Sequence, residues 1–256
     1  AGTTGCTVMV FDEHGKSLGQ GYEEYPCISP NPGWNEQDLE AVWKGICGAS
    51  RKAVAMADLP KDAYRSVGLS SQRGTFAALD ADKKPLGNSW VWNCGRALEY
   101  QEIFAKSITP DDHQTHTGMQ LSPLWSAAKI AWMRDHQPKT FEKARWFANG
   151  QEYFLHRLGA EDWATDPASL TLNGMMDIRA LDWSDRILKL CGIDRDRLPP
   201  VKQPSGVAGK LSKAAAAETG LPEGITLCRG AGDQQPAPAC PPTPARQPRP
   251  PRPRPR

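Results

Sequence analysis

The first seventy residues alternate between short apolar runs and polar turns. Residues 7–11 (TVMVF) are rich in β-branched and aromatic side chains, and the polar segment 12–15 (DEHG) ends in a glycine, as many hairpin turns do. A second strand is expected through Tyr22 and Tyr25. The pattern therefore predicts a β-hairpin at the start of the chain.

A long helix is predicted after this hairpin. Asn35, with the acidic Asp38 three residues later, is a candidate N-cap, and Leu59–Pro60 ends the helical pattern. One face of the helix is expected to be buried, because apolar side chains recur at helical spacing at Leu39, Val42, Trp43 and Ile46.

The rest of the chain mixes strands and helices. Residues 66–71 predict a short buried strand, and residues 75–79, 80–85 and 89–92 predict a second hairpin with its turn. Helices are expected around 121–132, over 183–191 before Gly192, and over 211–218 before Gly220, and a last strand over 225–228. This order indicates an α/β domain with a mixed sheet, hairpins and flanking helices.

Composition narrows the class of protein. With 256 residues, 39% hydrophobic content and nine tryptophans, the chain can bury a sizeable core. The formal charge of +2 conceals five arginines and no acid in the last twenty-one residues, so the remainder carries −3. A slightly acidic body does not favour nucleic-acid binding. No apolar run approaches the ~20 residues of a membrane span, so no membrane partner is expected either.

The seven cysteines are scattered and form no CxxC motif, and the five histidines are also dispersed. A zinc site is therefore not expected, and no metal-binding residue is assigned. Thiols in this arrangement are typical of reduced, structural cysteines, which favours a cytoplasmic protein.

Two segments near strands carry candidate chemistry. Gly2, Thr3 and Thr4 precede the first strand, where backbone N–H and hydroxyl groups can face a phosphate, although a plain hairpin turn is the better explanation of these residues alone. Gln72 and Arg73 follow a predicted strand, where they either bind sugar hydroxyls or lie in a solvated loop.

Trp92 and Asp233 are the other two candidates. Trp92 either stacks on a sugar ring or belongs to the core. Residues 230–233 (GAGD) read as a tight glycine turn that presents an acid, which either accepts a proton from a substrate hydroxyl or caps a helix.

Taken together, the order and spacing of these segments resemble the FGGY family of carbohydrate kinases over residues 1 to about 235. The segments that carry the resemblance are Gly2-Thr3-Thr4, residues 32–38 (PGWNEQD), 71–74 (SQRG) and 91–93 (VWN) with Arg96, Thr165-Asp166, and residues 220–222 (GLP) and 230–234 (GAGDQ).

The resemblance implies an actin-like ATPase (ribonuclease H-like) lobe that binds a small-molecule sugar or polyol, with ATP between this lobe and a second one. It implies that Gly2, Thr3 and Thr4 face the phosphates with Mg²⁺, and that Asp233 is the base on the sugar hydroxyl. It assigns the sugar site to Gln72, Arg73, Trp92 and Gln234. It also suggests a homodimer of the full-length protein.

The sequence departs from several family patterns that bear on the substrate. Glycerol kinases have a glutamate where Gly74 stands and a tyrosine where Leu124 stands, which counts against glycerol. Xylulokinases have a Met-His pair in place of Arg73-Gly74, which counts against xylulose. Cys94 replaces a common aspartate, and the chain begins after the acid that usually precedes the opening glycines. The sugar is therefore left open.

The last segment of the chain departs most from the family pattern. Residues 236–256 contain ten prolines, which exclude helix and central strand, so disorder or polyproline II is expected there. Proline, arginine and alanine share GC-rich codons, so a shifted reading frame is the preferred explanation, and a genuine tail that binds a partner is the alternative. The lobe without its partner is expected to be inactive. The competing function is a non-catalytic sugar-binding or interaction protein.

Overall fold

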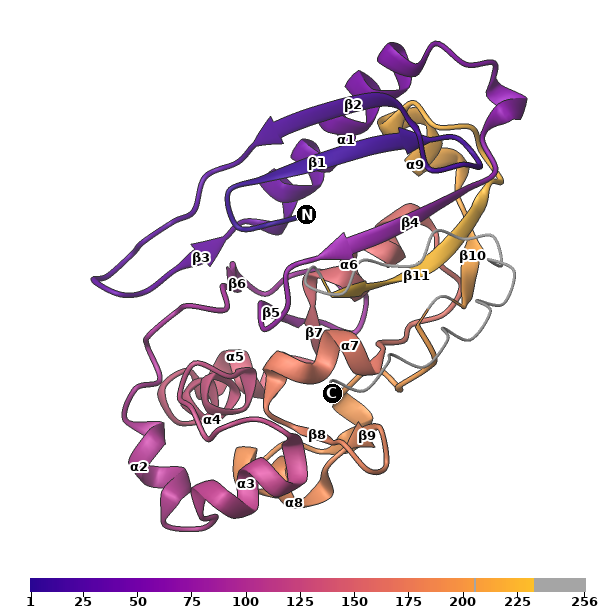
Figure 1. The fold of residues 1–256 in the computed structure, drawn as a ribbon. Helices are drawn as coiled ribbons and strands as arrows, with labels where there is room; N and C mark the ends of the chain where they lie inside the picture. The colour runs from indigo at the N-terminus through magenta and orange to yellow at the C-terminus, as the bar shows by residue number, and fades with distance from the viewer. Residues whose placement is uncertain (205, 233–256) are drawn as a thin grey trace, which may run out of the picture.

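The computed structural model describes residues 1–204 and 206–232 (Figure 1). Asp233, Gln234 and the proline- and arginine-rich segment 236–256 lie outside the described residues, as does the predicted domain boundary at 235.

The chain begins with the predicted hairpin. Strands β1 (Gly5–Phe11) and β2 (Ser17–Glu24) pair antiparallel, and the carboxylate of Asp12 closes the turn by accepting from the backbone N–H groups of His14 and Lys16, both at 2.9 Å. Figure 1 shows helix α1 (Leu39–Ala57) against this hairpin. The contact is close, because a Cβ at Gly21 would lie 2.0 Å from the carbonyl oxygen of Ala49.

The prediction of the α1 cap was wrong by three residues. Asp38, not Asn35, is the N-cap, and its carboxylate accepts from the backbone N–H of Glu40 at 2.9 Å. The reason is tertiary: strand β3 (Glu36–Gln37) pairs with a later strand, so these residues are extended and the helix cannot begin before them. The predicted buried face of α1 is confirmed.

A three-stranded sheet follows the order β10 (Val207–Lys210), β11 (Thr226–Gly232) and β4 (Ser66–Ser71). The β10–β11 pair is antiparallel and the β11–β4 pair is parallel, so the sheet is mixed, as expected. β4 was predicted to be a buried strand, but only two of its six residues, Leu69 and Ser71, are buried.

A four-stranded sheet lies beside it in the order β3, β6 (Ser89–Trp90), β5 (Phe76–Leu79) and β7 (Trp146–Asn149). All four residues of β5 are buried. Because side chains alternate along a strand, Phe76 and Ala78 enter one hydrophobic core while Ala77 and Leu79 enter another. β5 therefore separates the two cores.

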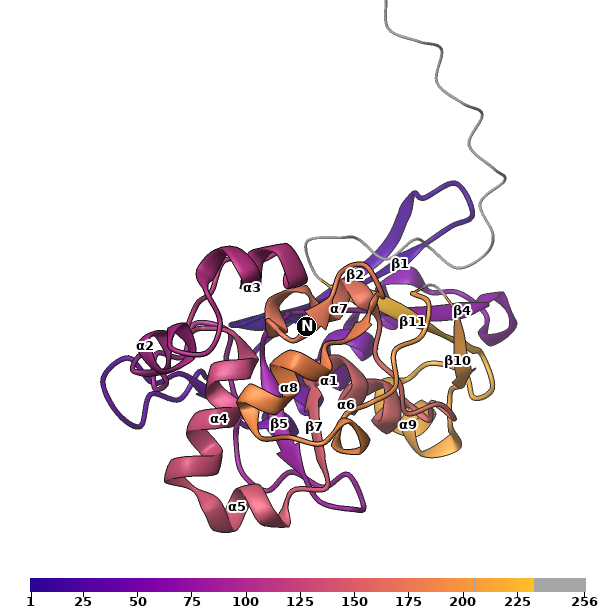
Figure 2. The same ribbon diagram turned by 90° about the horizontal axis from the view of Figure 1, so that it is seen from below.

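The helices divide between these two cores. Figure 2 shows α2 to α5 on one side of the molecule and α9 with β10 on the other. The remaining elements are α2 (Tyr100–Ala105), α3 (Pro110–Thr117), α4 (Ser126–His136), α5 (Pro138–Lys143), α6 (Gly150–Leu158), α7 (Pro167–Leu170), α8 (Asp185–Cys191), α9 (Lys213–Thr219), β8 (Met176–Asp177), β9 (Asp182–Trp183) and 3₁₀ turns at Lys61–Ala63, Thr171–Asn173 and Arg195–Arg197.

The three helices predicted over 121–132, 183–191 and 211–218 are confirmed, with shifted bounds. α4 begins at Ser126, after Leu121 and Leu124, and continues to His136. α8 and α9 are followed by the C-caps Gly192 and Gly220, both in the left-handed conformation. Within 1–204 and 206–232, no helix is both long and apolar enough to cross a bilayer. In this part of the chain Cys6, Cys27, Cys47, Cys94 and Cys191 are unpaired thiols, and all of these except Cys27 are buried.

Candidate functional site

The candidate site lies where two parallel strands end together. Gly232, at the end of β11, stands in register with Ser71 at the end of β4. Ligands of open α/β sheets bind at the carboxyl ends of such strands. The predicted binding residues Gln72 and Arg73 follow β4 at this edge.

The glycines of β11 permit a close approach rather than a turn. Residues 230–232 were predicted as a tight turn, but they belong to β11, which has an irregular register between Cys228 and Ala231. A Cβ at Gly230 would lie 1.3 Å from the carbonyl oxygen of Leu69, and a Cβ at Gly232 would lie 2.1 Å from Cδ of Arg73. Only glycine lets β11 end directly against Arg73.

The opening segment reaches the same edge. The amino group of Ala1 donates to the carbonyl of Ser70 at 2.6 Å, and the N–H of Gln72 donates to the carbonyl of Ala1 at 2.9 Å. The hydroxyl of Tyr25 lies 2.8 Å from the carbonyl of Gly2, and burial raises the pKa of Tyr25, which keeps it a donor. The predicted phosphate-facing residues therefore stand beside the predicted sugar-binding residues.

Thr3 connects the two groups. Its hydroxyl donates to Oε1 of Gln72 at 3.0 Å and accepts from the indole N–H of Trp92 at 3.2 Å. Thr4 is exposed and borders a shallow depression with Glu24, Tyr25 and Pro26. The tertiary fold thus assembles Thr3, Gln72 and Trp92 from three distant parts of the sequence.

Trp92 and Arg73 differ in accessibility. Trp92 is 42% exposed, which leaves ring surface open to a ligand, and its backbone N–H donates to the hydroxyl of Thr75 at 3.2 Å. Arg73 is 5% exposed, and its guanidinium donates to the hydroxyl of Thr171. An exposed indole beside a buried guanidinium suits a ligand that has both an apolar ring face and hydroxyl groups.

The sequence analysis did not assign a role to two polar residues of the site. Gln37 is fully buried, and its amide donates to the carbonyl of Thr3 at 2.6 Å. Thr171 comes from a 3₁₀ turn nearly one hundred residues after Arg73. Gln37 lies in the segment 32–38 that carries the family resemblance, but its polar neighbours gave no sign that its side chain would be buried. Thr171 had no sequence signal.

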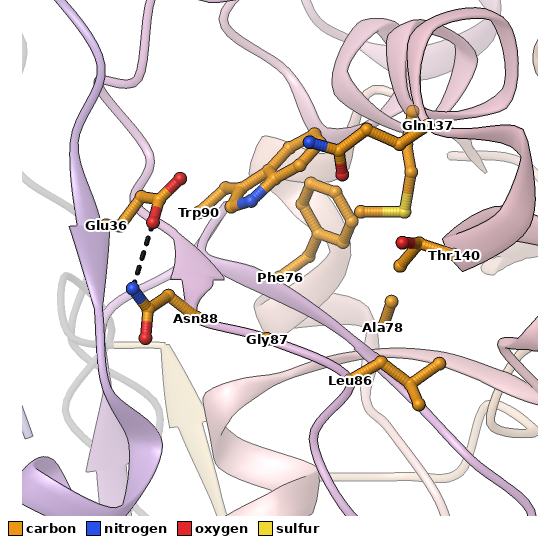
Figure 3. Close-up of a pocket in the computed structure, with 10 residues that line it drawn as sticks. Glu36, Phe76, Ala78, Leu86, Gly87, Asn88, Trp90, Gln137 and Thr140 are labelled. Atoms are coloured by element: carbon orange, nitrogen blue, oxygen red, sulfur yellow. Dashed lines mark hydrogen bonds between the residues drawn. The ribbon is translucent and has the colours of Figure 1, made fainter. Parts of the chain in front are cut away.

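A separate cavity of about 250 Å³ lies on the other face of the four-stranded sheet (Figure 3). Glu36 borders it and accepts from the amide of Asn88 at 3.0 Å, while the next residue, Gln37, points toward the opening segment. The residues that line this cavity are Glu36, Phe76, Ala78, Leu86, Gly87, Asn88, Trp90, Met133, Gln137 and Thr140.

The negative charge of Glu36 is balanced by an ion pair with Arg96. Its Oε1 lies 2.5 Å from Nη2 of Arg96, whose guanidinium carbon is 3.7 Å from the ring centre of Trp90 and 4.3 Å from that of Trp34. The Arg96 side chain is 1% exposed. This cluster is a buried structural ion pair, so the strand-end site is the better candidate for function.

Comparisons with known proteins identify the family of the chain. Residues 1–240 match the model of the FGGY family of carbohydrate kinases, N-terminal domain. A glycerol kinase from Thermococcus gammatolerans is 32% identical over 240 residues, which cover 92% of this chain and 47% of that protein. The chain therefore spans about half the length of the curated relatives it matches.

Solved structures give the same fold. A gluconate kinase from Lactobacillus acidophilus superposes with a TM-score of 0.84 at 22% identity, covering 91% of this chain and 46% of that one. A xylulose kinase from Rhodospirillum rubrum also gives 0.84, at 21% identity and with 91% and 48% coverage. The expected actin-like ATPase fold is confirmed, and the chain belongs to the FGGY family of carbohydrate kinases, whose N-terminal domain it matches.

Proposed function

We propose that this domain is the sugar-binding lobe of a protein that transfers a phosphoryl group from ATP to a hydroxyl of a sugar or polyol. The observation that carries the proposal is the meeting of Thr3, Gln72 and Trp92 beside Arg73 at the ends of β4 and β11. Trp92 would stack on the carbon face of the sugar, while Gln72 and Arg73 would bind its hydroxyls.

Asp233 and Gln234 complete the proposed site. Both lie outside the described residues, but Gly232, immediately before them, lies against Arg73. Asp233 would accept the proton of the attacking sugar hydroxyl, and Gln234 would bind a neighbouring hydroxyl. The family context supports this assignment.

ATP is the proposed phosphoryl donor, since carbohydrate kinases of this family use ATP, generally with Mg²⁺. Gly2, Thr3 and Thr4 would face its phosphates, although the Thr3 hydroxyl is engaged by Gln72 and Trp92. Among the residues described, no three His, Cys, Asp or Glu side chains are grouped to hold a metal ion. The described residues therefore present no cluster that would hold Mg²⁺ without oxygen ligands from substrate phosphates or water.

Because the chain spans about half the length of its relatives, phosphoryl transfer is proposed for the complete protein. The proposed location is the cytoplasm, where cysteine thiols stay reduced. A homodimer of that complete protein is part of the same proposal. This chain alone is expected to bind sugar without turnover. The alternative, a non-catalytic sugar-binding or interaction protein, predicts no turnover from the complete protein either.

Calorimetric titration with glycerol, D-xylulose and D-gluconate tests the binding step. We expect one of these probes to bind, and Trp92→Ala to weaken its binding at least tenfold, which corresponds to about 1.4 kcal/mol. Phe11→Ala is the control, because Phe11 is a similarly exposed aromatic residue (54%) outside the site. Equal losses in both variants would contradict the assignment of Trp92.

A coupled assay of ADP release tests the chemistry. The isolated chain is expected to give no sugar-dependent release, and the complete protein to turn over at roughly 1–100 s⁻¹. Turnover at this rate by the chain alone would overturn the assignment of the second lobe. Sugar binding without turnover in the complete protein would favour the non-catalytic alternative.

A further inference from the structure

Lys129 is a charged residue inside an apolar helix. The α4 segment 126–133 is buried throughout, and Lys129 has no exposed surface. An isolated ammonium group is very unfavourable in such surroundings unless all its N–H groups are bonded. A buried lysine in this place therefore needs specific partners.

Three backbone carbonyls supply these partners. Nζ of Lys129 lies 2.7 Å from the carbonyl oxygen of Val91, 2.9 Å from that of Trp92 and 3.5 Å from that of Gly74. An ammonium group has three N–H donors, so each carbonyl takes one. The contacts join two loops that are separate in sequence, one directly after Arg73 and one that carries Trp92.

We propose that Lys129 is a positioning residue for the sugar site, because it holds the loop after Arg73 and the loop of Trp92 at a fixed separation. This inference rests on the proposed function, in which these two loops bind the sugar. Lys129 does not touch the sugar itself; it acts through the backbone of the residues that do.

The electrostatic surroundings of Lys129 support a role in positioning the two loops over a role in stabilising the fold. The pKa of Lys129 is lowered to about 7, mainly by burial; the nearby Cys94 opposes this effect and the charge of Arg96 adds to it. In the described part of the chain, Lys129 has no ion pair with a carboxylate. An apolar residue of similar volume would remove the penalty of burying the charge, but it would leave three carbonyls without donors.

The test begins without any sugar. The indole N–H signals of the nine tryptophans are recorded by ¹⁵N NMR on the full chain, with Trp92→Phe to assign the signal of Trp92. We expect Lys129→Met to shift or broaden the Trp92 signal more than those of the other tryptophans. An unchanged Trp92 signal in Lys129→Met would overturn the proposal, whether or not any sugar binds.

A matched variant separates positioning from general loss of stability. Ile187 is fully buried in the same hydrophobic core on α8, so Ile187→Ala lowers the melting temperature while leaving the three carbonyls bonded. Ile187→Ala is expected to retain the Trp92 signal. If it perturbs that signal as much as Lys129→Met does, Lys129 has no special positioning role.

A pH titration of the unmodified chain covers the case in which Lys129→Met does not fold. Loss of one ammonium proton removes one of the three donors, so the Trp92 indole signal is expected to move between pH 6 and 8. A Trp92 signal that stays constant while the ammonium group of Lys129 loses its proton would overturn the proposal.

Sugar binding then gives the functional readout. For whichever of glycerol, D-xylulose or D-gluconate binds the unmodified chain, Lys129→Met is expected to raise Kd at least tenfold and Ile187→Ala less than threefold. An unchanged Kd in Lys129→Met contradicts the positioning role. Failure of all three probes to bind the unmodified chain counts against the proposed function instead, and the Trp92 signal still decides the role of Lys129.

Discussion

The amide of Gln72 donates to the Oε1 of Gln37 at 2.5 Å, although 35 positions separate the two residues in the sequence. Gln37 in turn donates to the carbonyl of Thr3, whose hydroxyl donates back to Gln72. This closed set of hydrogen bonds attaches the opening segment to the end of β4. The buried amide of Gln37 thus determines where the candidate phosphate-facing and sugar-binding residues stand.

Replacing Gln37 with alanine is expected to destabilise the fold by about 1–3 kcal/mol, because it leaves the Thr3 carbonyl and the Gln72 amide with fewer partners. Urea denaturation measures the change. Gln20→Ala is the control, since Gln20 is exposed on β2 and its loss should change the stability by less than about 0.5 kcal/mol. Similar values for the two variants would show that the buried amide is unimportant.

Gly74→Ala is expected to destabilise by about 1–2 kcal/mol, because Gly74 has a φ of +67° and its new Cβ would lie 3.1 Å from Cβ of Leu172. Gly87→Ala is the matched control, since nothing lies within 4 Å of a Cβ there. Thermal unfolding of both variants measures the difference. Equal melting temperatures would exclude strain at Gly74.

Arg96→Met is expected to cost about 3–5 kcal/mol, because it leaves the partly buried Glu36 without its cation and removes the guanidinium from between two tryptophan rings. Arg186→Met should cost less than about 1 kcal/mol, since the Arg186–Asp112 pair is exposed. Denaturant titration compares the two. A loss below 1 kcal/mol at Arg96 would contradict its structural role.

Glu152 makes stability depend on pH. Burial raises the pKa of its carboxyl from 4.5 to about 7, while the unfolded chain retains the ordinary value. Between these values the folded state binds the extra proton, so this group's contribution to the unfolding free energy falls as the pH rises from 4.5 to 7. Glu152→Gln removes this dependence and keeps the capping-box geometry with Asn149.

The stability of Glu152→Gln relative to the unmodified chain is therefore expected to increase with pH, by up to about 3 kcal/mol between pH 4.5 and 7.5. Denaturation curves at several pH values test this. The matched variant Glu142→Gln, at an exposed position on α5, should show a constant difference. A constant difference for Glu152→Gln as well would exclude the raised pKa.

Local sequence signals were sufficient for about half of the strands and helices, but they did not predict β7, β10 or the helices α2, α3 and α5 to α7. The hairpin of β1 and β2 and the buried face of α1 follow from side-chain periodicity, and Gly192 and Gly220 mark helix ends because they adopt left-handed conformations. The cap of α1 was misplaced because strand pairing with β6 keeps Glu36 and Gln37 extended. Local propensity carries no information about such a distant partner.

The candidate site, like the fold, was predicted from the sequence only in part. The sequence by itself indicated Thr3, Gln72, Arg73 and Trp92 as candidate ligand-binding residues, because hydroxyl, amide, guanidinium and aromatic groups lie at the ends of predicted strands in the order of a known family.

Only the tertiary structure decided that these residues meet, and that the buried polar groups of Gln37 and Lys129 hold them together. The physical reason is that a hydrogen bond between distant segments depends on the packing of the whole chain. A buried polar residue shows its partners only once the fold has brought them within reach.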